Sequence, residues 1–279
     1  MPTISADVAA LDTVHFDHPP LVEMVLGVQF GPLAGFTSAH FGWFWREYLT
    51  KDWPGVLTVP ELPDQFEEFE PSSPWRPPSL QLKLRAPEEP GRVQFSNADG
   101  DRSIQIQRSR FLYNWRKREG PYPSHDQACV EFGEHLDTFR RFVAAAGLGP
   151  LTLNQWEVTY VNRIAKGSLW TKPEDWSAVL PGLLTAEPDD AALPLESLSL
   201  QRHCVISQRE GRLHLLVQHA RLGPSGDEAL VVQLTARGPL RPDDQENAAR
   251  GIALGHAACL REFLRITSAE AQKAWGRRS

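Results

Sequence analysis

The stretch LTLNQWEVTYVNRI, residues 151–164, sets the fold that we expect for this chain. Its residues alternate between the two faces of an extended strand. One face carries Trp156, Val158, Tyr160, Asn162 and Ile164, and the other carries Gln155, Glu157, Thr159, Val161 and Arg163. Because this stretch follows a long helical pattern and a Gly-rich break, we interpret it as the first strand of a second half.

The first half of the chain shows a comparable order of elements. We expect a strand at 21–30, a helix at 38–52, strands at 80–86, 92–96 and 103–118, and a helix at 124–146. Apolar residues change parity within 103–118, which predicts a β-bulge near 108–110. The capping box Ser124–Gln127 marks the start of the last helix, and Gly147 marks its end.

The second half repeats this order after the central strand. The pattern predicts a short helix at 172–185, strands at 198–207, 212–222 and 229–237, a helix from Asp243 or Asp244 to 264, and a last helix at 267–275. A tight turn at Glu210–Gly211 is expected to join the first two of these strands. In that register His203 and His214 lie four residues apart along the strand, about 13 Å, which is too far to share one metal.

These elements predict an α+β fold made of two strand-helix-three-strand-helix pseudo-repeats. After a lead-in at 1–18, the first pseudo-repeat spans 19–147, including a Pro-rich loop at 54–79, and the second spans 148–279. The two are expected to form one compact unit, a curved and mainly antiparallel sheet with long helices on one face. A similar element order occurs in the TATA-binding-protein fold and in helix-grip ligand-binding folds, an analogy that carries no function.

Composition indicates an ordinary globular protein. The chain has 279 residues, 41% of them hydrophobic, and a net charge of −6, which argues against DNA as the default partner. No apolar run is long enough to span a membrane, and no signal peptide is recognisable. Three widely spaced cysteines fit reduced thiols, so we expect a cytoplasmic, bacterial-type protein without a membrane partner.

Polar residues on apolar faces are the candidate ligand-binding residues. Tyr160 and Asn162 share the apolar face of the central strand, and His256 shares the inner face of the last long helix with Ile252, Cys259 and Phe263. Glu23 is placed to pair with Arg163 if the two halves meet there. Such residues either orient a ligand or form a buried network that fixes the strands, and the structural alternative is favoured.

Basic residues gather at 102–118, where the candidates for nucleic-acid binding are Arg108, Arg110, Arg116 and Lys117. Phe111, Tyr113 and Trp115 are interleaved with them, and single-stranded nucleic acid needs such a mixture of charges and rings. Strand alternation places the rings with Lys117 alone among the basic residues. A solvated strand beside a buried aromatic row is therefore the preferred interpretation.

Motifs for common active sites are missing from the sequence. We find no phosphate-binding glycine loop, nucleophile elbow, C-x-x-C pair or complete zinc motif. We therefore expect no metal, no cofactor and no catalytic residue that is recognisable from local spacing.

Three short stretches resemble a sporadically distributed family of uncharacterised bacterial proteins. They are Pro19–Glu23, Tyr160–Ile164, and His256 together with Phe263, Thr267, Glu270 and Trp275. The resemblance implies a shared architecture and no activity, since the family has none established.

Three functions remain open. The leading hypothesis is a non-enzymatic interaction protein that binds a protein partner or its own copy through the free sheet face or the 54–79 loop. The alternatives are a small-ligand binder or enzyme with a cavity between sheet and helices, and a nucleic-acid binder using the 102–118 strand.

Overall fold

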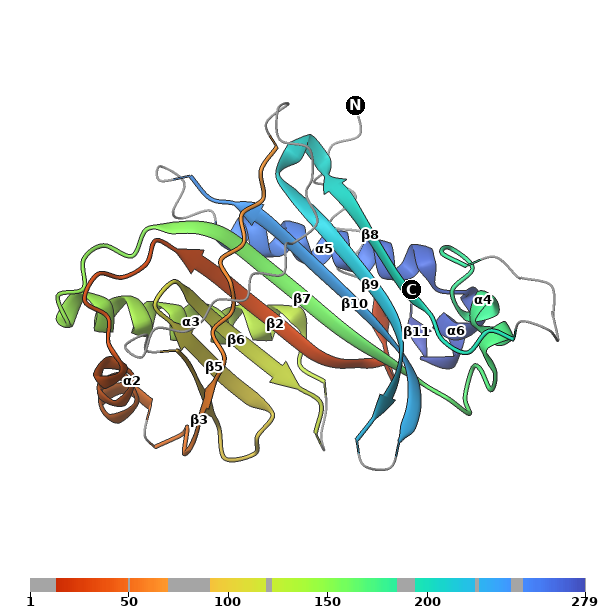
Figure 1. The fold of residues 1–279 in the computed structure, drawn as a ribbon, viewed down its shortest axis with the longest axis horizontal. Helices are drawn as coiled ribbons and strands as arrows, with labels where there is room; N and C mark the ends of the chain where they lie inside the picture. Colours follow the sequence, from red (N-terminus) through yellow and green to blue (C-terminus); the bar gives the residue numbers. More distant parts are fainter. Residues whose placement is uncertain are drawn as a thin grey trace.

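The computed structural model describes residues 14–49, 51–69, 91–118, 122–184, 194–223, 226–241 and 248–278. Within them, one antiparallel sheet has nine strands in the order β3-β4-β5-β6-β2-β7-β10-β9-β8 (Figure 1). The strands are β2 (Leu21–Phe30), β3 (Gly55–Val59), β4 (Arg92–Ser96), β5 (Arg102–Gln107), β6 (Arg110–Arg116), β7 (Leu153–Ala165), β8 (Ser199–Ile206), β9 (Gly211–Leu222) and β10 (Asp227–Pro239). The predicted α+β class with a large antiparallel sheet is confirmed.

Strand β7, which contains most of the 151–164 stretch, lies in the middle of the sheet. It pairs with β2 on one side and with β10 on the other. Leu26 lies opposite Val158 and Met24 opposite Tyr160, so the apolar rows of β2 and β7 share one face. The alternation of both sequences thus determines which side of the sheet is apolar.

The two long helices cover that apolar side, which we call the helix face (Figure 1). The helical elements are α2 (Ser38–Phe44), the π-helical turn η1 (Trp45–Leu49), α3 (His125–Ala145), the 3-10 turns η2 (Pro173–Asp175) and η3 (Ser207–Arg209), α4 (Trp176–Val179), α5 (Ala248–Ile266) and α6 (Ala269–Ala274). Helix α3 packs Phe139 against Phe111 of β6, with ring centroids 5.3 Å apart. Helix α5 lies against β7, β9 and β10.

Trp156 of β7 shows how closely α5 approaches the sheet. Its side chain is buried at 2% exposure, and it lies against four glycines from three elements: Gly211, Gly238, Gly251 and Gly255. A β-carbon added at Gly251 would lie 2.4 Å from Trp156 Cδ1. The absence of side chains at these positions therefore makes room for the indole.

A second, two-stranded sheet joins the start of the described chain to its end. Strand β1 (His15–Phe16) pairs with β11 (Arg277–Arg278). The Phe16 ring packs edge-on against Phe263 of α5 and Trp275, with centroids 6.0 and 6.4 Å away. These contacts fix the start of the described chain to the C-terminal helices.

Several expected elements differ in the structure. The parity change near 108–110 is a tight hairpin turn between β5 and β6, and not a bulge within one strand. Of the helix predicted at 172–185, the described residues 172–184 form only η2 and α4. Strand β3 was not expected, because it lies at the start of the Pro-rich loop. The strand predicted at 80–86, most of the 1–18 lead-in and the cap at Asp243 or Asp244 lie outside the described residues.

The turn between β8 and β9 also differs from the expected one. Residues Gln208 and Arg209 adopt left-handed backbone angles, with φ of 56° and 62°, and the turn is longer than the predicted Glu210–Gly211 pair. The register consequently places His203 directly opposite His214, so the predicted separation of about 13 Å is wrong.

Candidate functional site

Residues 60–69 cross the side of the sheet opposite the helices, which we call the open face (Figure 1). We call this segment the strap. At its start Arg92 Nε donates to the Pro60 carbonyl at 3.0 Å, and at its end Arg209 Nη1 donates to the Phe69 carbonyl at 3.1 Å. The strap therefore runs from the β3–β4 side of the sheet to the β8–β9 hairpin, and the open face is covered.

Buried glutamines of the sheet bind the main chain of the strap. Gln107 Nε2 donates to the Leu62 carbonyl at 2.9 Å, while its Oε1 accepts the Leu62 N–H at 3.0 Å. Gln29 Oε1 accepts the N–H of Gln65 at 2.9 Å. Because both glutamines are almost fully buried, the strap provides hydrogen bonds that these amides need.

Glu67 anchors the far half of the strap. Its N–H donates to Gln155 Oε1 at 3.2 Å, and its carboxylate forms ion pairs with Arg212, with His214 at 2.6 Å and with Arg237 at 3.4 Å. Burial alone would raise the pKa of Glu67, but the His214 hydrogen bond and the electrostatic interactions with His214, Arg237 and Arg212 lower it below its ordinary value. The carboxylate is consequently charged at neutral pH.

A second buried carboxylate extends this network along the open face. Glu157 accepts from Arg237 Nε at 2.8 Å and from Arg110 Nη1 at 3.5 Å. Burial raises the pKa of Glu157, but the two guanidinium groups outweigh it and lower the pKa overall. Arg110 Nη2 also donates to the Pro63 carbonyl at 3.1 Å, so the network connects the sheet to the strap again.

On the helix face, the predicted residues Tyr160 and His256 do meet. Tyr160 Oη lies 2.7 Å from His256 Nδ1 and 3.0 Å from His125 Nδ1 of α3. The two imidazole rings stack with centroids 3.8 Å apart. Cys129 Sγ, one turn along α3, lies 3.2 Å from His125 Nε2. The four side chains form a hydrogen-bonded row between α3, β7 and α5.

Burial controls protonation in this row. Burial, together with the adjacent His125, lowers the pKa of His256 to about 3, so its ring is neutral at ordinary pH. Burial and the charge of Asp126 raise the pKa of the Cys129 thiol to about 11, and burial raises the pKa of Tyr160. His256, Tyr160 and Cys129 are therefore uncharged at neutral pH, as expected for members of a buried hydrogen-bonded network.

The other predicted ligand-binding residues lie apart from this row. Asn162 Nδ2 donates to a β10 carbonyl at 3.3 Å. The proposed pair of Glu23 with Arg163 does not form: Glu23 pairs with Arg116 at 3.0 Å. Arg163 lies 3.9 Å from Asp227. Glu23 and Asn162 are thus bonded to neighbouring strands, whereas the buried Nε of Arg163 has no hydrogen-bond partner among the described residues.

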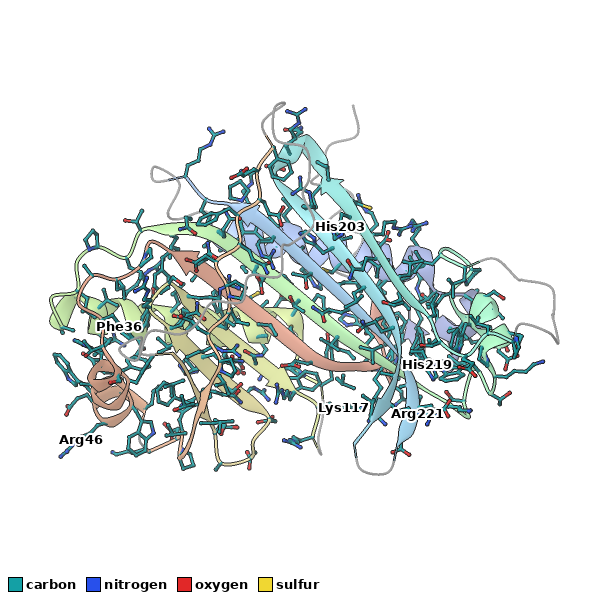
Figure 2. The ribbon with its side chains drawn as sticks, viewed as in Figure 1. Phe36, Arg46, Lys117, His203, His219 and Arg221 are labelled. Carbon is teal, nitrogen blue, oxygen red and sulfur yellow. The ribbon has the colours of Figure 1, made fainter. Side chains whose placement is uncertain are left out.

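The basic residues at 102–118 do not form one exposed surface. Arg110 is buried at 5% exposure beneath the strap, whereas Arg108, Arg116 and Lys117 are exposed, with Lys117 just beyond the end of β6 (Figure 2). The aromatic residues of this strand are buried on the helix face: Phe111, Tyr113 and Trp115. The rings are therefore not exposed beside the basic residues of this strand.

His203 and His214 lie opposite each other on the open face, and not four residues apart as the sequence predicts. His203 Nδ1 lies 2.7 Å from His214 Nδ1, and His214 in turn contacts Glu67 of the strap. Figure 2 shows His203 far from His219, which instead contacts Trp170 and Trp176 near α4. Within the described residues, no group of three or more His, Cys, Asp or Glu side chains has an arrangement that could hold a metal ion.

No protein-family model matches the chain, and no curated protein matches it significantly. Among the helices that the structure describes, none has the length and apolar character needed to cross a membrane. The candidate functional regions consequently rest on the geometry alone: the strap with the open face beneath it, and the row of Tyr160, His125, His256 and Cys129.

Proposed function

We propose that this chain is a non-enzymatic interaction protein that contacts a protein partner, or a second copy of itself, through the segment at 55–69. The observation that carries the proposal is a rigid display of apolar groups. Phe66 is 56% exposed on the strap, although its neighbours Gln65 and Glu67 are fixed to the sheet. A large ring held outward by a fixed backbone is typical of a contact surface.

The edge strand before the strap extends this surface. Val56 and Leu57 of β3 are more than half exposed. Leu57 lies opposite Gln94, which belongs to the open-face row of β4, so Leu57 is on the same side of the sheet as the strap. Leu57 and Phe66 are thus two exposed apolar side chains on the same side of the sheet, at either end of the 55–69 segment.

Photo-crosslinking tests this proposal. With p-benzoylphenylalanine at Phe66 we expect adducts between chains or with a co-purifying protein, because this ring is at the contact surface. The control position is Val130, which is 60% exposed on α3 and is expected to give few adducts. The proposal is contradicted if three results occur together. Phe66 gives intrachain adducts alone, light scattering shows a monomer, and pull-downs retain no other protein.

The finer architecture is also part of the proposal. We infer that 19–147 and 148–279 are two pseudo-repeats joined at β2 and β7. Strand order supports this, because β4-β5-β6-β2 is mirrored by β8-β9-β10-β7, and a long helix follows the last hairpin of each half. The resemblance to an uncharacterised bacterial family agrees with a shared architecture but supplies no function.

Ligand binding or catalysis at the Tyr160 row is the second candidate. It is favoured by the continuous contact from Cys129 through His125 and Tyr160 to His256. An enzyme of this type would use Cys129 as a nucleophile, which requires a readily formed thiolate.

Cysteine alkylation separates the two candidates. With iodoacetamide at pH 8 we expect the exposed Cys204 to react first and the fully buried Cys259 last. Cys129 is expected to react more slowly than Cys204, because burial raises its thiol pKa to about 11. Mass spectrometry of timed samples gives the order. Faster alkylation of Cys129 than of Cys204 would favour the enzyme.

A further inference from the structure

We propose that the open face of the sheet is a receptor for extended acidic peptide segments, and that the strap is its built-in occupant. A partner protein would bind by placing an acidic segment of its own where residues 60–69 now lie. This inference deepens the proposed function, because it rests on an interaction at the same segment and names the chemistry of the partner.

The first argument is that the face binds the backbone of the strap more than its side chains. Gln107 exchanges two hydrogen bonds with Leu62, and the strap N–H groups of Gln65 and Glu67 are accepted by glutamine amides. Four arginines donate to strap carbonyls: Arg92, Arg110, Arg209 and Arg212. Main-chain contacts of this kind accept any extended segment, as in other modes of peptide recognition.

The second argument is charge complementarity. The strap, PELPDQFEEF, carries four carboxylates and no basic residue. The face beneath it presents buried Arg110 and Arg237, half-buried Arg212 and His214, and one half-buried acid, Glu157. Any occupant that covers the face buries this excess of positive charge, which is unfavourable unless the occupant pairs it. An occupant must therefore be acidic.

The third argument gives the spacing of the acids. Asp64 Oδ1 accepts from Ser109 Oγ at 2.6 Å, and Glu67 meets Arg212, His214 and Arg237 three residues later. Between these two anchors Phe66 points outward and is not recognised. The geometry thus specifies an extended segment with two acids at positions i and i+3, in which the residue before the second acid is free to vary.

A peptide-binding experiment tests the receptor. The probe is a fluorescent peptide with the sequence of residues 60–69, and the receptor is the full chain carrying Asp64→Asn and Glu67→Gln, which weakens the strap without altering the face. In the wild-type chain the tethered strap competes at an effective concentration of about 1 mM. We expect fluorescence anisotropy to show peptide affinity for the variant at least about tenfold higher than for the wild type.

Two controls make the result specific. The same peptide with its own Asp64→Asn and Glu67→Gln changes is expected to bind poorly. Adding Arg212→Gln and Arg237→Gln to the receptor variant is expected to abolish binding of the acidic peptide. Equal binding of both peptides, or no gain of affinity in the strap variant, would overturn the receptor.

Amide exchange in the wild-type chain covers the case in which the variant does not fold. Excess acidic peptide is expected to accelerate exchange of the Leu62 and Gln65 amides, which are bonded only to glutamine side chains in this contact, and to leave β2 amides unchanged. Unchanged exchange of both sets contradicts the inference. Light scattering gives the mass of the protein in solution. A dimer in the absence of peptide would overturn the partner segment, because the occupant of the face would then be the strap of a second copy.

The two proposals fail separately. If the peptide does not bind but position 66 still crosslinks to another chain, the receptor is wrong and the interaction function stands. If the peptide binds but photo-crosslinking at position 66 captures neither a second chain nor another protein, the interaction function is wrong.

Discussion

Replacing Glu67 with alanine is expected to lower the free energy of unfolding by about 3–5 kcal/mol, the cost typical of breaking a buried ion pair. The Glu67 side chain is 4% exposed. Its carboxylate contacts two guanidinium groups, of Arg212 and Arg237, and the imidazole of His214. Its loss leaves two guanidinium groups near the sheet surface without their shared counter-charge. Urea denaturation followed by circular dichroism measures the change.

The neighbouring residue provides the control. Glu68 is exposed, so solvent screens the contacts of its carboxylate, and its carbonyl bond with Arg212 is preserved by a side-chain change. Glu68→Ala is therefore expected to change stability by no more than about 0.5 kcal/mol. Similar losses for the two variants would show that the Glu67 network contributes little.

The same network predicts how stability depends on pH. The folded pKa values of Glu67 and Glu157 are lower than their ordinary values, so their stabilisation is fully present above the unfolded-state pKa of about 4.3. It is lost as pH falls through the folded values, because protons then bind the unfolded state more readily. In Glu67→Ala the loss of stability below pH 4.3 should be shallower than in the wild type.

Gly251→Ala is expected to destabilise the protein by about 1–3 kcal/mol, as overpacking of a filled core does. The added methyl would lie 2.4 Å from Trp156 Cδ1 and 2.5 Å from Cγ. Neither β7 nor α5 can retreat easily, because Gly255 brings the same helix against Trp156 and Val158 one turn later. Thermal unfolding of the variant and the wild type gives the difference.

Gly133→Ala is the matched control for this substitution. Gly133 lies within α3, and a β-carbon added there meets no atom within 4 Å. The change should stabilise the protein by about 0.4–1 kcal/mol, since alanine restricts the unfolded chain more than glycine does. A stabilising Gly251→Ala would mean that α5 packs less closely on the sheet than the contacts indicate.

The features that could be predicted from sequence are those with local periodicity. The alternation of 151–164 and of 21–30 was sufficient to identify β7 and β2 and the side that each buries. Tyr160 and His256 were both assigned to inner faces, and because β7 and α5 pack together, these residues meet. His125 is not predicted as their partner, although it lies four residues before Cys129 on the helix face that carries Phe132, because a polar residue at the first position of a helix is normally solvated.

The strap and its contacts could not be predicted in this way. Glu67 and Glu68 are identical neighbours in an acidic run, and only long-range contacts make one buried and the other exposed. The partners of Glu67 lie 145–170 residues later in the chain. The hairpin at 108–109 was read as a bulge because both features change the parity of the apolar residues.

The two ends of the strap are anchored to parts of the chain that are synthesised at different times. Residues 60–69 leave the ribosome long before Arg212, His214 and Arg237, the groups that bind Glu67. Domains generally fold N-terminal first during synthesis, so β2, β5 and β6 can pair while the far half of the strap has nothing to bind. The near half of the strap can bind Gln29, Gln107 and Arg110 as soon as the first half is made. The end that carries Glu67 can dock only after β9 and β10 exist, which makes closure of this end a late step of folding.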